Sequence, residues 1–203
     1  RNKHILVLTG NGMLSLVGFA ISALLFHSMS RTNVGIWFFV QSIIALFEAI
    51  RYGFLSTATV KFYAGVAPER ARTVLGSVWY LAFLLTGSIV LINACAFFFL
   101  PYIHNEELIA CIKWSGIIFL CTMPSDVIFW RLQADEKYGT LLWYSTLNSG
   151  LSAIFFSVLI YLDKMTLETA FLSSLCVNLI TSAVGILCNL SGMKMMRHRT
   201  KEC

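Results

Sequence analysis

The sequence predicts an all-α membrane protein, a polytopic bundle of six transmembrane helices with both termini in the cytoplasm. Two features of the composition and one of the pattern predict this fold. Hydrophobic residues make up 58% of the 203 residues, charged residues make up only 12%, and the apolar residues gather into long runs. A soluble domain carries about twice that charged fraction. A soluble fold of this length would therefore lack the polar residues that must cover its surface.

Six apolar runs are each long enough to cross the hydrocarbon core, which takes about 20 helical residues. Backbone polar groups find no water in lipid, so each run should be a helix. Together the runs form one six-helix lobe, residues 1–193, followed by a basic cytoplasmic tail, residues 194–203. No room remains for a soluble catalytic domain. In chain order the runs lie near residues 5–27, 36–61, 74–100, 107–130, 141–162 and 167–190.

The basic residues lie between alternate runs, and this pattern orients the bundle. Of the 15 Lys and Arg residues, 11 lie before the first run or after the second, fourth and sixth. Arg31, Lys113 and Lys164 lie at the opposite ends, and Arg51 lies inside the second run. Cytoplasmic loops carry the excess of Lys and Arg, so both termini are predicted to be cytoplasmic. The net charge of +5 then reflects topology and attraction to anionic lipids, not a nucleic-acid partner.

The tryptophans near the ends of the runs are expected to anchor the helices at the headgroup layer. Trp37 and Trp114 fall near predicted outer ends, whereas Trp79, Trp130 and Trp143 fall near predicted inner ends.

Polar stripes run along four of the predicted helices, because positions i, i+4, i+7 and i+11 share one helical face. Such stripes allow close helix packing, or they line a shared aqueous cavity. Four stripes together favour the cavity, although both interpretations stay open. The stripes are Asn11, Ser15, Gly18 and Ser22 in the first run; Ser115, Thr122, Asp126 and Gln133 in the fourth; Ser145, Asn148, Ser149 and Ser152 in the fifth; and Ser174, Asn178, Thr181, Ser182, Gly185 and Asn189 in the sixth.

The second run carries two charges that are costly in a membrane. A charged side chain at the bilayer centre costs at least about 2.5–3.5 kcal/mol. Glu48 and Arg51 are three residues apart and close enough on a helix to pair. Gly53 follows, and a helix loosened there would expose backbone groups to a water-filled cavity. An arginine at such a place would also bind a phosphate in bidentate fashion. A structural ion pair and a substrate site are equally open.

The remaining reactive residues predict no metal site, no cofactor and no enzyme. The cysteines in or beside the runs show no C-x-x-C spacing, and no histidine lies at ligand distance in sequence. Cysteine packs as a small hydrophobe in such places. The sequence has no H-E-x-x-H motif and no plausible Ser–His pair.

Two stretches carry a family resemblance. In SMSRTNVGIWFFVQSIIALFEAIRYGFLSTATVKFYAG (28–65), an arginine precedes a glycine in an outer loop, and an apolar helix ends near Arg51-Tyr52-Gly53. In LQADEKYGTL (132–141), Gln-Ala is followed by acidic and aromatic residues. These stretches resemble the first outer loop with the second helix, and the loop between helices 4 and 5, of the polysaccharide and oligosaccharide-lipid flippases. Those flippases belong to the multidrug/oligosaccharidyl-lipid/polysaccharide exporter superfamily, and the resemblance is to their N-terminal half.

The resemblance implies a fold of two six-helix lobes around a central cavity that opens alternately to each side. This chain would supply the first lobe. The second lobe would be a C-terminal half or a partner chain. The implied function is transport of a lipid-linked oligosaccharide across the bacterial cytoplasmic membrane for surface polysaccharide biosynthesis, without covalent chemistry.

The resemblance also assigns roles to the polar residues of the spans. Family members place positive residues in the cavity to hold the pyrophosphate of a polyprenyl-linked sugar. Arg51 is the candidate here, and Arg31 would lie at the outer mouth. Glu48 or Asp126 would take up H⁺ or Na⁺ to couple transport to an ion gradient. Candidates for hydrogen bonds to sugars are Asn11, Asn148, Asn178 and Asn189.

A second branch of the same superfamily gives the alternative function, an H⁺- or Na⁺-coupled multidrug and toxic compound extrusion antiporter. Such a transporter of organic cations needs an acidic cavity. Glu48 and Asp126 would supply one, and Arg51 works against it. A membrane protein that does not transport, in which the stripes serve only packing, is a further possibility.

Overall fold

The computed structural model describes residues 2–63 and 65–192, including the side chains of all of these except residues 2–11, 13 and 68. Within these residues all regular structure is helical, as predicted, with six long α-helices and one short 3₁₀ turn. The predicted basic tail, 194–203, lies outside the described residues. The α-helices are α1 (Asn2–Ser28), α2 (Arg31–Tyr63), α3 (Pro68–Phe97), α4 (Glu106–Ala134), α5 (Tyr138–Tyr161) and α6 (Leu167–Leu187), and the 3₁₀ turn η1 covers Leu100–Tyr102.

Five of these helices are long and apolar enough to span a membrane. They are α2, α4, α5 and α6 over their whole lengths and α3 from Glu69 to Phe97. In the part of α1 that the structure describes in full, the apolar segment is the shorter Leu14–Ser28. The chain is therefore a multi-pass helical membrane protein with at least five candidate spans. The sixth span and the cytoplasmic placement of the termini stay predictions.

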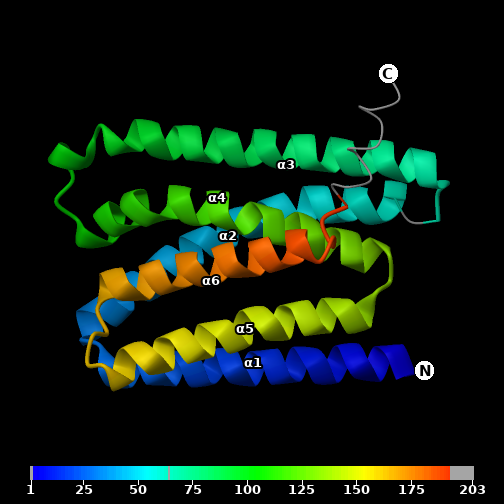
Figure 1. Cartoon of the computed structure of the whole chain (residues 1–203). Helices are drawn as coiled ribbons and strands as arrows, with labels where there is room; N and C mark the ends of the chain where they lie inside the picture. Colours follow the sequence, from blue (N-terminus) through cyan, green and yellow to red (C-terminus); the bar gives the residue numbers. More distant parts are fainter. Residues whose placement is uncertain (1, 64, 193–203) are drawn as a thin grey trace.

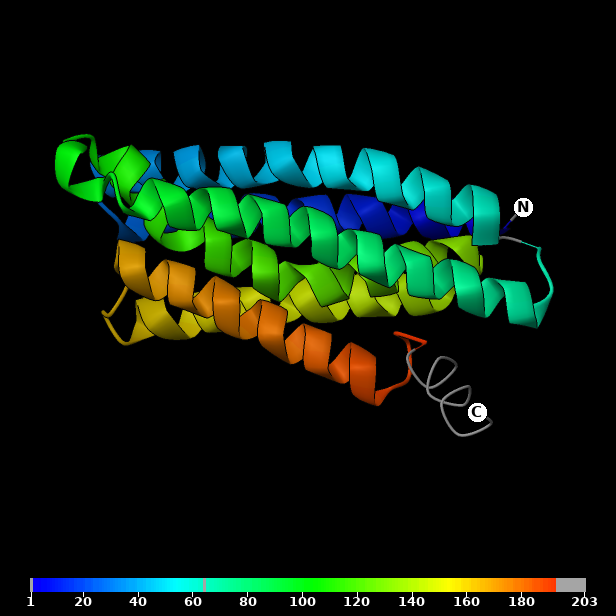
Figure 2. The same ribbon diagram turned by 90° about the horizontal axis from the view of Figure 1, so that it is seen from above.

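The helices alternate in direction along the bundle (Figure 1). The α1–α2, α3–α4 and α5–α6 connections therefore lie at one end, and the start of α1 and the end of α6 lie at the other. Helix α4 occupies the centre and contacts α2, α3, α5 and α6. Helix α1 packs along α5 and meets α2 only sparsely, so α1 and α2 spread apart from their shared connection (Figures 1 and 2).

Helix α2 starts earlier than the sequence predicts and is not interrupted at Gly53. The backbone N–H of Asn33 donates to the Ser30 hydroxyl (3.3 Å), and that of Val34 donates to the Ser30 carbonyl (3.0 Å). These bonds begin the helix at Arg31, so Arg31 and Gly35 lie in its first turns and not in a loop. The helix continues through Gly53 without interruption. The loosened backbone predicted at Gly53 is therefore not formed.

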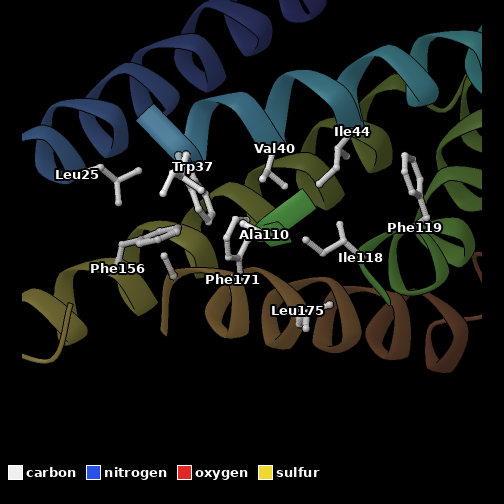
Figure 3. Packing of buried hydrophobic residues seen from close by; sticks show 12 residues of the cluster. Leu25, Trp37, Val40, Ile44, Ala110, Ile118, Phe119, Phe156, Phe171 and Leu175 are labelled. Atoms are coloured by element: carbon white, nitrogen blue, oxygen red, sulfur yellow. The ribbon is translucent and has the colours of Figure 1, made fainter. Parts of the chain in front are cut away.

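One end of the bundle holds a core shared by five helices, which we call the closed-end core. Its centre is aromatic: the Phe171 and Trp37 rings lie 4.8 Å apart between centroids (Figure 3). The half-buried Trp114 packs against this core, with its ring 5.3 Å from that of Phe171. The Phe156 ring meets Trp37 edge-on at 5.9 Å. The core comprises Leu25, Ile36, Trp37, Val40, Ile44, Ala110, Ile118, Phe119, Phe156, Ala170, Phe171 and Leu175.

Towards the other end, which we call the divided end, the packing separates into two cores. One joins α2, α3 and α4, and the other consists of Ile128, Leu132 and Tyr144 from α4 and α5. The bundle is thus tied together at one end and split at the other. The first of these two cores comprises Leu55, Tyr63, Leu75, Val78, Trp79, Ala82, Met123, Val127, Trp130 and Ala134.

The tryptophans correct a prediction. Trp37, Trp79 and Trp130 are only 6%, 4% and 1% exposed, so they pack in the cores and do not anchor the helices at headgroups. Trp143 is the exposed one, at 49%. The indole N–H of the buried Trp79 donates to the Ser191 carbonyl (3.4 Å), so this polar group keeps a hydrogen-bond partner in the core.

Candidate functional site

Arg51 is a fully buried arginine in the middle of the bundle, with 2% of its surface exposed. It projects from α2 towards α3 and α4. One terminal nitrogen donates to the Thr86 hydroxyl (3.1 Å) and the other to the Thr122 hydroxyl (3.2 Å). The second nitrogen also forms an ion pair with the carboxylate of Asp126. The guanidinium carbon lies 5.8 Å from the centre of the Phe119 ring, within range of a cation–π contact.

The partner of Arg51 is therefore a carboxylate 75 positions away, and not Glu48. Within the described residues Glu48 makes no ion pair or hydrogen bond, although it lies in the electrostatic field of Arg51. The local pairing left open by the sequence is not formed. The ion pair instead fastens α2 to α4, while Thr86 adds α3 to the same node.

Two pockets lie on either side of this node, and Glu48 and Asp126 line both. The first has a volume of about 290 Å³ and lies between α2 and α4. The second, of about 260 Å³, is bounded by α2, α4, α5 and α6. The first pocket is lined by Ala45, Glu48, Ala49, Arg51, Tyr52, Asp126 and Trp130. The second is lined by Glu48, Thr122, Ser125, Asp126, Phe129, Tyr144, Ser145, Asn148, Ser149 and Asn178.

The second pocket brings together three of the four polar stripes. Asn148 from α5 and Asn178 from α6 both line it, as predicted for residues that face a shared cavity. Thr122 and Asp126 come from the stripe on α4. The stripe on α1 does not reach the pocket, because α1 packs on α5 instead. The side chain of Asn11 lies outside the described residues.

Two predicted site residues lie away from the pockets. Arg31 is exposed in the first turn of α2, at the closed end. Asn189 follows the end of α6 with a φ of +59°, and its side chain is exposed. The Arg131 guanidinium holds that turn by donating to the carbonyls of Asn189 (3.2 Å) and Leu190 (2.7 Å). Asn189 therefore lies in the turn that ends α6, and Arg131 stabilises that turn.

A second polar node lies at the second pocket and joins α4, α5 and α6. The hydroxyl oxygens of Ser125 and Ser182 are 2.7 Å apart, and Tyr144 donates to the Ser125 hydroxyl at 3.1 Å. Tyr144 also lies within hydrogen-bond distance of the Thr181 carbonyl (3.2 Å), and Ser182 donates to the Cys121 carbonyl (3.2 Å). Every hydroxyl of this node is partnered, so it is fitted for packing as well as for lining the pocket.

Sequence patterns missed several residues of these nodes. Thr86 stands alone in an apolar stretch of α3, and a single threonine carries no signal. Tyr144 and Ser125 lie off the stripes, although a buried tyrosine hydroxyl generally needs a partner. Gln133, which does lie on the α4 stripe, accepts from the Tyr52 hydroxyl (3.1 Å) and the Ser56 hydroxyl (3.3 Å) and ties α2 to α4.

The electrostatics of the site are simple. Two carboxylates and one guanidinium lie in the core of the spans, and one carboxylate is neutralised by the guanidinium. The other, Glu48, is a second carboxyl group in the same pockets, whose walls apart from the ion pair consist of hydroxyl, amide and apolar groups. In the described part of the chain, no group of three or more His, Cys, Asp or Glu side chains is placed to hold a metal ion. The pockets offer hydrogen-bond donors and acceptors to a ligand.

No protein-family model matches this sequence, and neither the curated proteins nor the solved structures include a significant match to the chain.

Proposed function

We propose that this chain is one lobe of a multi-pass transporter that flips a lipid-linked oligosaccharide across the bacterial cytoplasmic membrane for surface polysaccharide biosynthesis. The observation that carries the proposal is the polar pocket of about 260 Å³ between membrane-spanning helices. Asn148, Asn178 and the serines of α5 offer it the amide and hydroxyl groups that bind sugar hydroxyls. Arg51 beside it is the charge for the phosphate.

A second six-helix lobe belongs to this proposal. Asp126 is 31% exposed in the single chain, and Glu48 lines both pockets beside it. Carboxylates facing lipid would be costly, and ionisable residues within membranes face protein or water. A second lobe, covalently continuous or as a partner chain, would cover these pockets.

Transport in this proposal involves binding and release only, and the residues divide as follows. Arg51 holds phosphate, Asn148 and Asn178 hold sugar, and the carboxylates Glu48 and Asp126 take up the coupling ion, H⁺ or Na⁺. Arg31 and Asn189 have no support as ligands from the described geometry, because neither side chain lines a pocket. The sugar-binding role predicted for Asn11 stays a prediction, because its side chain lies outside the described residues.

The test is deletion of the gene followed by measurement of lipid-linked saccharide and surface glycan. We expect lipid-linked saccharide to accumulate in the inner leaflet and surface glycan to disappear. A plasmid copy should restore export, and Arg31→Gln serves as a matched control because that arginine lies outside the pockets. Unchanged surface glycan in the deletion strain would rule out this substrate.

One observation favours a second function, H⁺- or Na⁺-coupled extrusion of organic cations. The pockets hold two carboxylates against one guanidinium that is already paired, so their surplus charge is negative. Tyr52 and Trp130 line the first pocket, and aromatic faces attract organic cations. Resistance to cationic drugs conferred on a sensitised strain, with surface glycan unaffected, would support this function over the first.

A further inference from the structure

Asp126 occupies the position on Arg51 that an anionic ligand would take. A guanidinium offers a planar fork of donors that fits a carboxylate and a phosphate alike. Of the five N–H donors of this guanidinium, one is held by the Thr86 hydroxyl and one by the Thr122 hydroxyl, and the carboxylate of Asp126 takes the charge-assisted contact. A phosphate that takes this charge-assisted contact must replace that carboxylate.

The carboxylate is the member of the pair that is free to leave. Asp126 has a side-chain exposure of 31%, against 2% for Arg51, and it lines both pockets. Arg51 is meanwhile held from two sides by the threonines and by the Phe119 ring. Rotation of Asp126 into a pocket would therefore uncover the guanidinium and leave it in place.

We propose that Asp126 competes with the phosphate of the substrate for Arg51, and that the carboxylate, once released from Arg51, binds the coupling cation. The inference rests on the function proposed above and specifies how its ion coupling arises. With Asp126 on Arg51 the pair is neutral. With phosphate on Arg51 the carboxylate stands unpaired among apolar helices, a costly state until a proton or Na⁺ joins it. Phosphate and cation therefore strengthen each other's binding, and this linkage is reciprocal.

Four charged or titratable side chains face Asp126, and they have to be distinguished from it as sites of proton uptake. From α2 these are Glu48, Arg51 and Tyr52, and from α5 the pocket adds Tyr144. Glu48 is the competing candidate because it is a second carboxylate in the same pockets. The tyrosines are hydrogen-bonded, Tyr52 to Gln133 and Tyr144 to Ser125.

The experiment uses the full-length protein in lipid nanodiscs and inorganic sulfate as the probe. Sulfate resembles phosphate and remains a dianion between about pH 5 and pH 8, so only the protein titrates. Binding is read from tryptophan fluorescence, since Trp130 lines the first pocket beside Arg51 and Asp126. We expect sulfate to bind about tenfold more tightly at the acidic end, in the range usual for coupling between sites. A parallel series at the alkaline end adds Na⁺ against choline, and tightening there identifies Na⁺ as the cation.

Substitutions of single carboxylates show which of them takes up the proton or Na⁺. Asp126→Asn should bind sulfate as tightly at the alkaline end as the wild type does at the acidic end, with no dependence on pH or Na⁺. The exposed carboxylate in the first turn of α6 gives the matched control, and Glu168→Gln should behave as wild type. If the dependence disappears in Glu48→Gln and remains in Asp126→Asn, Glu48 is the titrating group and the proposal is wrong.

The wild type alone also decides the matter, should Asp126→Asn fail to fold. A sulfate affinity that changes with neither pH nor Na⁺ would overturn the competition while leaving a phosphate site at Arg51 intact. Sulfate binding that persists in Arg51→Gln at wild-type affinity would instead remove the phosphate site, and with it the proposed function.

Discussion

The closed end and the middle of this bundle are held together by different forces. At the closed end, five helices meet through apolar and aromatic side chains centred on Phe171. In the middle, the helices meet through two polar nodes, one around Arg51 and one around Ser125 and Tyr144. Lipid is as apolar as a leucine side chain, so apolar contacts gain little from burial in a membrane and depend on packing. The polar nodes specify which helices meet and where.

This difference predicts that substitutions in the two regions have unequal effects, and it can be tested by unfolding the protein with SDS in mixed micelles. The largest effect is expected at the ion pair. Arg51→Gln leaves the half-buried carboxylate of Asp126 without its partner. The loss in the free energy of unfolding should lie towards the lower end of the about 3–5 kcal/mol that breaking a buried ion pair costs.

The double variant Arg51→Gln/Asp126→Asn sharpens this prediction, because it removes both charges. We expect it to recover a large part of the lost stability, since no uncompensated charge remains. If the double variant were as unstable as the sum of the two single variants, the pair would not be coupled, and Arg51 would be held by its threonines alone.

A smaller effect is expected at Gly185, where α6 approaches α4 and α5 closely. A methyl group at Gly185 would lie 2.5 Å from the Ile128 Cδ1 atom and 3.0 Å from the Tyr144 ring. Gly185→Ala should therefore destabilise the protein by about 1–3 kcal/mol, as overpacking generally does. Gly150→Ala in α5 is the matched control, because nothing lies within 4 Å of the added atom. Equal stability of the two variants would show that the approach of α6 is loose.

The smallest effect is expected in the closed-end core. Ile118→Leu keeps the volume of a buried side chain, which is 3% exposed, and such swaps usually cost less than about 1.5 kcal/mol. The same unfolding measurement checks it. A loss as large as that of Arg51→Gln would contradict the contrast between the two regions.

The helices were largely predictable from the sequence, whereas the contacts that build the site were not. Long apolar runs predict helices because backbone groups must bond internally in lipid. Each of the six runs corresponds to one α-helix, although the third, fifth and sixth runs extend one to three residues beyond the helix end. The stripes on α4, α5 and α6 predicted residues that line a common pocket. The start of α2 was missed by five residues because Ser30 begins the helix through its own side chain and carbonyl.

The pairing of Arg51 escaped prediction for a physical reason. Glu48 is a neighbour in sequence, but Asp126 is a neighbour in space that only the packing of α2 on α4 brings close. Thr86 is likewise recognisable as a partner of Arg51 only once the packing of α3 against α2 is known. Asn189 was assigned to the stripe of α6 because its spacing continues the helical period, whereas the helix ends at Leu187. Helix ends set by long-range contacts, here from Arg131, leave no periodic signal.

The central claim is that the buried guanidinium of Arg51 holds the phosphate of a transported lipid-linked glycan. The most direct measurement is the rate at which a fluorescent lipid-linked oligosaccharide moves from one leaflet to the other in proteoliposomes that contain the full-length protein. Arg51→Ala should abolish movement although the protein remains inserted, and Arg51→Ala/Asp126→Asn should also be inactive although the uncompensated charge is gone. Movement at the wild-type rate in either variant would contradict the claim, and the Arg51–Asp126 pair would then be purely structural.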